Sequence, residues 1–107
     1  MNYELARRLK DAGFPQGGKG NWVLPPDSIV ARHSDRVYVP SLEEIIELVP
    51  KTTNDGLFSI SYVAHQYWVA GYEKYALLVP ECWGSTPVEA VARLWLLLNK
   101  AYETHKP

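Results

Sequence analysis

The side chains that could support catalysis are one cysteine and three histidines, scattered along the chain. Cys82 is the only cysteine, and the histidines are His33, His65 and His105. A thiolate beside an imidazole can act as a nucleophile, so a Cys82–His65 pair would indicate a small cysteine-dependent enzyme. No histidine has a partner at metal-ligand spacing, and one cysteine cannot build a cysteine-rich zinc site. We interpret the histidines as solvated and Cys82 as a buried or half-buried thiol.

Two further patterns have structural explanations that need no chemistry. Glu43, Glu44 and Glu47 are explained by a capping box and by the solvated face of a helix capped by Ser41. The glycine-rich run 17–20 lacks the GxxxxGK[ST] phosphate-binding pattern and is not held between a clear strand and a helix. We therefore predict a flexible loop at 17–20. We expect a non-enzymatic protein with no catalytic residues, no cofactor and no metal.

Aromatic residues are the unusual feature of the composition. They include 4 Trp, 7 Tyr and 2 Phe in 107 residues, and six of them fall between positions 62 and 83. Alternate positions of paired strands would place some of these rings on the sheet face away from the helices. The alternative is that they form core and cross-strand pairs. Because Tyr and Trp dominate interface hot spots, we predict a candidate interaction surface of Tyr67, Trp68, Tyr72, Tyr75, Trp83 and Leu96.

A second class of partner is nucleic acid. Exposed aromatic rings can stack on bases, and basic side chains can contact phosphates. The candidate phosphate contacts are Arg7, Arg8, Lys10 and Lys19. The chain has 11 Lys and Arg against 12 Asp and Glu, a net charge of −1, and this balance argues against nucleic acid without excluding it.

Local signals predict helices near both ends and in the middle of the chain. The first spans about 3–12, with Asn2 as its N-cap. The second follows the capping box at Ser41 and ends at Pro50, and the third spans 87–102 after Thr86 as N-cap and Pro87 at its first position. The third helix is apolar over most of its circumference. It should therefore either pack centrally on a sheet or meet another chain.

The strands are predicted from alternation and from turn signals. A three-stranded meander is expected from 57–63, 67–70 and 75–79, with a turn at 71–74. Residues 15–28 are expected to be a loop, in which Trp22 either covers the core or is exposed for binding. Short strands at 28–32 and 36–39 could form a hairpin and extend the meander.

These elements predict a single α+β domain over residues 1–107, with two layers in the order α-(β)-β-α-β-β-β-α. Helices should cover mostly one face of the antiparallel sheet. The longest apolar run, 94–98, is far shorter than the roughly 20 residues of a membrane span. With no secretory signal at the start and one cysteine, we expect a soluble cytoplasmic protein with no membrane partner.

Three blocks of the sequence resemble a family of small uncharacterised proteins encoded by bacteriophages and prophages. The blocks are YELAxxLKDAGFPQ at 3–16, VYxPxLEExIE at 37–47 and WGxTPxEAVARLW at 83–95. The resemblance implies a bacterial or phage-infected cytoplasm and an α+β domain. It implies no functional residues, because the family has no assigned activity. The broad apolar circumference of helix 87–102 and the surplus of aromatic residues lead us to expect a protein-interaction module that binds a protein partner or a second copy of itself.

Overall fold

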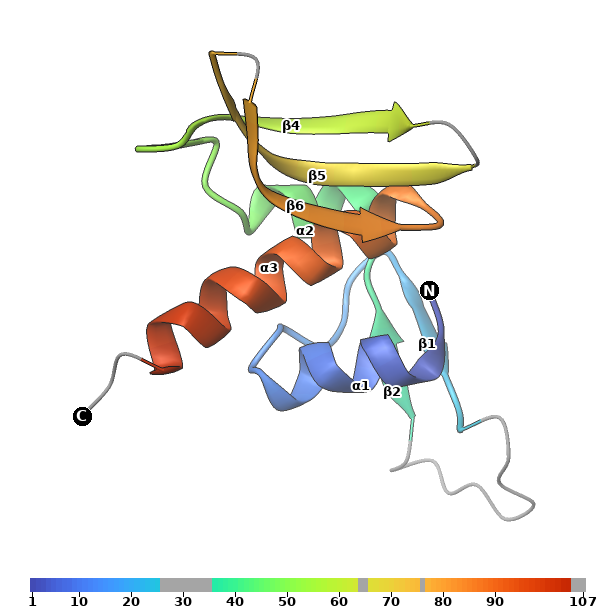
Figure 1. Ribbon diagram of the computed structural model, residues 1–107. Coiled ribbons are helices and arrows are strands. Elements are labelled where there is room, and N and C mark those ends of the chain that lie inside the picture. The colour runs from blue at the N-terminus through green and yellow to red at the C-terminus, as the bar shows by residue number, and fades with distance from the viewer. Residues whose placement is uncertain (26–35, 64–65, 76, 105–107) are drawn as a thin grey trace.

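The fold consists of three helices and two antiparallel sheets. A computed structural model describes residues 1–25, 36–63, 66–75 and 77–104. A four-stranded sheet has α2 and α3 on one face, and a separate two-stranded sheet lies beside α1 (Figure 1). This arrangement confirms the predicted α+β class.

The larger sheet is a meander of neighbouring strands. It comprises, in spatial order, β3 (Thr52–Thr53), β4 (Gly56–Val63), β5 (Tyr67–Lys74) and β6 (Leu77–Gly84). Ile60 lies opposite Ala70, which lies opposite Cys82, and these three side chains belong to the core beneath the helices. The two-residue alternation of strands therefore directs the neighbouring side chains to the opposite face. We call that opposite face, away from α2 and α3, the outer face.

The predicted boundaries of β5 and β6 were wrong in one informative way. The turn expected at 71–74 is part of β5. The strand expected at 75–79 begins at Leu77 and continues to Gly84 as β6. The register between these strands shifts between Ala70 and Tyr72, opposite Pro80. A proline fits here because β6 is an edge strand, where a missing backbone donor breaks no ladder bond. Gly71 also allows close approach, since a Cβ there would lie 2.0 Å from the Pro80 carbonyl oxygen.

The smaller sheet was predicted only in part. It pairs β1 (Asn21–Val23) with β2 (Val37–Val39), which confirms the strand expected at 36–39. The loop expected over 15–28 is wrong at β1, and the strand expected at 28–32 lies outside the described residues. The pair does not extend the meander: it forms its own sheet, with β2 packed on α1.

The helices begin where their capping residues predict. The Asn2 side chain accepts from the Leu5 amide before α1 (Tyr3–Asp11), and Ser41 forms a complete capping box before α2 (Leu42–Glu47). Before α3 (Pro87–Thr104), the Thr86 hydroxyl accepts from the Glu89 amide. Each cap satisfies an amide of the first turn that has no partner within the helix.

The last helix is the centre of the core. α3 packs on β5 and β6 on one side and on α1 and α2 on the other. Val91 and Leu94 are fully buried, and Trp95 meets Phe14 edge to face at 5.0 Å between ring centroids. The central packing predicted for an all-round apolar helix is confirmed for this part of α3. Leu97, further along, is exposed.

Candidate interaction surface

Two of the six residues predicted to form an interaction surface lie together on the outer face. Tyr67 and Trp83 are 49% and 44% exposed, and their rings meet edge to face at 6.2 Å between centroids. Val69, the register partner of Trp83, is buried although it faces away from the helices. The two rings therefore cover part of the outer face and leave their own edges open to a partner.

Three of the six residues belong wholly or partly to the core, which corrects the prediction. Tyr72 is 1% exposed, and its hydroxyl donates to the Pro50 carbonyl oxygen at 2.8 Å. Trp68 is half-buried against the core, because it lies two positions before Ala70 on the helix-facing side of β5. Leu96 is also buried. For Tyr72 and Trp68 the alternative of core and cross-strand pairs therefore holds, and Leu96 belongs to the centrally packed part of α3.

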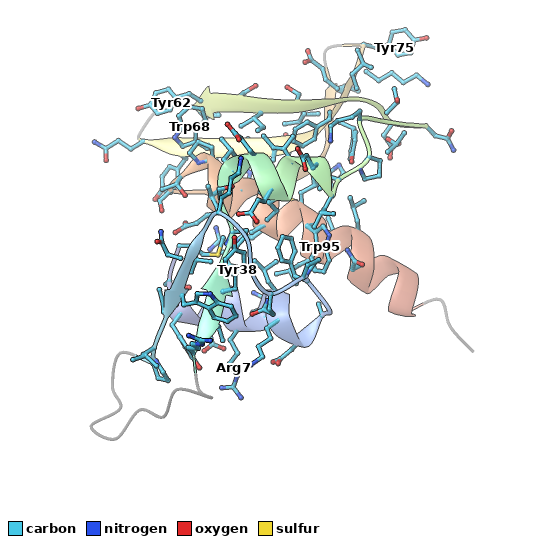
Figure 2. The ribbon with its side chains drawn as sticks, turned by 180° about the vertical axis from the view of Figure 1, so that it is seen from behind. Arg7, Tyr38, Tyr62, Trp68, Tyr75 and Trp95 are labelled. Carbon is cyan, nitrogen blue, oxygen red and sulfur yellow. The ribbon has the colours of Figure 1, made fainter. Side chains whose placement is uncertain are left out.

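Tyr75 lies away from the other exposed rings. It is 89% exposed and follows β5 with a positive φ of 54°, and the ammonium of Lys74 lies 5.6 Å from its ring. Figure 2 shows Tyr75 at the opposite end of the sheet from Tyr62 and Trp68. Tyr75 is therefore not part of the surface formed by Tyr67 and Trp83.

A groove of about 590 Å³ runs between α1, α3 and the edge strand β6. Its charged side chains are Arg8 from α1, Arg93 from α3 and Glu81 from β6. Its apolar wall includes Trp83 and Leu97, and buried residues form the remainder. We call this the Arg8–Arg93 groove. Because Trp83 belongs both to the groove and to the exposed ring pair, the two features form one continuous surface.

Arg93 has a structural role at this groove. Its guanidinium donates to the Trp83 carbonyl oxygen at 2.5 Å, so it occupies part of the open edge of β6. Arg8 is exposed, and the described residues place no carboxylate within ion-pair distance of it. Among the residues that the structure describes, the Arg8 side chain thus has no ion-pair partner and can bind a ligand.

Cys82 lies at the buried side of the same groove. Burial raises the pKa of its thiol, and the nearby charge of Arg93 offsets this only in part. A raised pKa leaves little thiolate at neutral pH, which is the opposite of an activated nucleophile. The proposed partner, His65, lies outside the described residues.

The four basic residues predicted as phosphate contacts have different surroundings. Arg7 forms an i,i+4 ion pair with Asp11 at 3.9 Å, and it points away from the body of the molecule (Figure 2). Arg8 lines the groove, and Lys10 is exposed on α1. Lys19 belongs to the loop before β1, and a hydrogen bond from its backbone helps to lower the pKa of Glu44. Of these four residues, Arg8 is the one that lines the groove together with Trp83.

A polar cluster that the sequence did not indicate joins the smaller sheet to α2. The buried Tyr38 hydroxyl accepts from the Gly20 amide and donates to Glu44 Oε1, both at 2.5 Å. The hydrogen bond from Tyr38 and that from the Ser41 amide hold the pKa of Glu44 below its usual value. Burial raises the pKa of Tyr38. The glycine-rich loop is thus fastened to a buried tyrosine.

Trp22 covers this cluster from the solvent side. Its ring lies 5.4 Å from that of Tyr38, and the Arg36 guanidinium lies over the indole at 4.4 Å. Trp22 remains 43% exposed. The structure thus combines the two expectations for this residue, since one side of the ring covers buried atoms and another faces solvent.

The described part of the chain contains no group of three or more His, Cys, Asp or Glu side chains able to hold a metal ion. None of the helices, as far as the structure describes them, has the length and hydropathy to cross a bilayer. Comparisons with protein-family models, curated proteins and solved structures gave no match to this chain. The function is therefore argued from the surface itself.

Proposed function

We propose that this chain is a non-enzymatic protein-interaction module of phage or prophage type that acts in the cytoplasm. Its partner is a protein that places an acidic segment with apolar neighbours in the Arg8–Arg93 groove. The observation that carries the proposal is the continuity of two exposed aromatic rings, Tyr67 and Trp83, with a groove in which Arg8 has no ion-pair partner among the described residues.

The charges of the groove favour an acidic occupant. It contains two guanidinium groups and one carboxylate, and Arg8 has none of its charge neutralised by a contact within the described chain. An arginine can bind a carboxylate through two parallel hydrogen bonds, which fixes orientation as well as adding affinity. Trp83 and Leu97 would then contact the apolar neighbours of the acidic residue.

The energetics favour a few strong contacts within this surface. Tryptophan, tyrosine and arginine are the residue types most enriched among interface hot spots. All three types are present here, and both rings are already ordered by contact with each other. Binding would therefore lose little side-chain entropy at the two aromatic positions.

The test is affinity capture from a bacterial lysate with four versions of the chain. Arg8→Glu and Trp83→Ala change the groove, and Tyr75→Ala removes a still more exposed ring at the far end of the sheet. We expect the wild type and Tyr75→Ala to retain the same protein. We expect each groove variant to bind it at least about tenfold more weakly. Thermal melting of each variant establishes that it is folded.

Two outcomes would overturn the proposal. In one, the captured protein binds the groove variants as tightly as the wild type. In the other, the chain binds single-stranded or duplex nucleic acid with an affinity that falls steeply with salt and is lost in Arg8→Glu, which would support the nucleic-acid alternative.

A further inference from the structure

The edge strand β4 has an open backbone along its second half. The Phe58 amide donates to the Lys51 carbonyl oxygen at 2.9 Å, so the backbone groups of Phe58 point toward the β3 side. Backbone direction alternates along a strand, and Ile60 and Tyr62 therefore direct their N–H and C=O groups to the same side. β3 pairs only with residues 56 and 57, and no other described element pairs with this edge.

Natural proteins usually protect such an edge, and β4 has none of the usual devices. Residues 56–63 contain no charge and no proline, and the alternation of the strand is unbroken by a bulge. The opposite edge of the sheet is different. β6 carries Pro80 and a register shift, and Arg93 binds one of its outward carbonyls. Long, flat and uncharged edges pair with another strand.

We propose that a second copy of this chain pairs with β4 in antiparallel fashion, so that two sheets join into one. The open segment 59–63 begins beyond the part of β4 that β3 covers and ends with the strand at Val63. A short partner strand is enough to pair with the whole of this segment. The same segment of a second copy has the required length, and Ser61 then lies on the two-fold axis.

The side chains suit this register. Ile60 of one copy lies opposite Tyr62 of the other, with their outward backbone groups facing each other as a hydrogen-bonded pair. Cross-strand pairs of an aromatic and a β-branched residue are favourable. Ser61 faces its own copy at a non-hydrogen-bonded position, where opposed side chains lie closest. Ser59 lies on the same face but opposes Val63, so it is distant from its own copy.

Figure 1 agrees with this placement. β4 runs along the margin of the larger sheet, and over its second half none of the elements drawn in colour lies beyond it. Tyr62 is 59% exposed at this end, and its ring rests on Trp68 at 5.3 Å between centroids. The pairing surface is separate from the Arg8–Arg93 groove, which lies at β6 on the opposite edge.

A charge exchange at the two-fold axis tests the proposal. Ser61→Lys and Ser61→Glu each place two like charges opposite one another, which opposes pairing, whereas an equal mixture brings unlike charges together. By sedimentation, we expect the wild type to approach twice the 12.1 kDa of one chain as concentration rises. Each Ser61 variant should remain monomeric, and their mixture should recover the dimer. Ser59→Lys is the matched control and should dimerise as the wild type does.

Oxidative cross-linking gives a second measurement of the register. Ser61→Cys should form a disulfide between two copies, and Ser59→Cys should not, because only position 61 faces itself. The proposal is overturned if the wild type stays monomeric up to about 1 mM. It is also overturned if the charge variants dimerise alone, or if Arg8→Glu abolishes dimerisation while Ser61→Lys does not. The last result would place the second copy in the groove.

Discussion

The hydroxyl of Tyr38 donates a hydrogen bond to Oε1 of Glu44 at 2.5 Å, and this bond joins the smaller sheet to α2. The same oxygen accepts from the Ser41 amide at 3.0 Å, which closes the capping box of α2. One carboxylate thus caps the N-terminus of α2 and also holds β2 in place through Tyr38. Both bonds are stronger to the ionised form of Glu44, because a charged carboxylate oxygen is the better acceptor.

Acid should therefore weaken the fold through Glu44. The Tyr38 hydrogen bond holds the pKa of this carboxyl below its usual value. A carboxyl with a lowered pKa in the folded state stabilises the protein above its unfolded pKa. That stabilisation is lost as the pH falls through the lowered value. We expect Glu44→Gln to lower the free energy of unfolding at neutral pH and to flatten its decline in acid.

Urea denaturation between about pH 7 and about pH 3 measures this effect. Glu43→Gln is the matched control, because it removes the same charge from an exposed position of the same helix. If both variants lose stability with pH as the wild type does, the Tyr38–Glu44 bond does not cause the acid dependence.

Alanine substitutions in the glycine-rich loop should separate the cost of backbone strain from the cost of a steric clash. Gly17 and Gly18 both have positive φ, but a Cβ on Gly17 would meet nothing within 4 Å. A Cβ on Gly18 would lie 2.0 Å from Glu44 Oε2 and 2.8 Å from the Tyr38 hydroxyl. Gly17→Ala should cost about 1 kcal/mol from backbone strain, and Gly18→Ala should cost clearly more. Equal losses in thermal unfolding would contradict the contact between this loop and Tyr38.

The centre of α3 should be the most sensitive part of the core. Leu94 is fully buried, so Leu94→Ala should lower the free energy of unfolding by about 2–5 kcal/mol through lost burial and a cavity. Leu57 is exposed on the sheet, and Leu57→Ala should change stability by less than about 0.5 kcal/mol. Chemical denaturation compares the two, and a loss below about 1 kcal/mol for Leu94→Ala would show that the site collapses around the smaller side chain.

The buried hydroxyl of Tyr72 offers a smaller, more specific effect. Tyr72→Phe removes the hydrogen bond to Pro50 and leaves the ring contact with Phe58, so it should cost about 1 kcal/mol. Tyr62→Phe is the control, because that ring is largely exposed and should tolerate the change. Equilibrium unfolding of both variants gives the comparison. If Tyr72→Phe loses no stability, a water molecule donates to the Pro50 carbonyl oxygen in place of the tyrosine hydroxyl.

Cys82 should react slowly with thiol reagents in the native protein. Burial both restricts access and raises the pKa of the thiol, so the fraction of thiolate is small at neutral pH. Alkylation measured at several pH values should be much faster in urea than in buffer. A native rate equal to the unfolded rate would indicate an accessible, activated thiol and would revive the cysteine-enzyme hypothesis.

The sequence predicted the features that depend on near neighbours. Ser41 and Thr86 mark helix starts because a cap needs only the first turn of its own helix. The alternation of β4 likewise predicted its two faces. The Tyr38–Glu44 cluster was missed because Gly20 and Gln16 reach Tyr38 from 18 and 22 residues away. No periodic pattern records such contacts.

The sequence indicated some of the exposed aromatic rings of the sheet but not which of the six residues are buried. Tyr67 and Trp83 are exposed, as an interaction surface requires, but Tyr72 is core. Tyr72 was assigned wrongly because alternation gives the face of a residue only when the extent of its strand is known. β5 and β6 continue past their expected ends, through the register shift at Gly71 and Pro80. The sequence predicted Arg8 only as a phosphate contact, because its place at the groove depends on how α1 packs near β6 and α3.

The position of α3 also determines the order in which the domain can assemble. It is the last of the elements along the chain, yet it contacts α1, α2, β5 and β6. During synthesis, the earlier elements therefore emerge with their apolar faces open, since the helix that covers them is made afterwards. Stable folding must wait for α3, and until then the open edge of β4 and the uncovered sheet are the segments most exposed to aggregation.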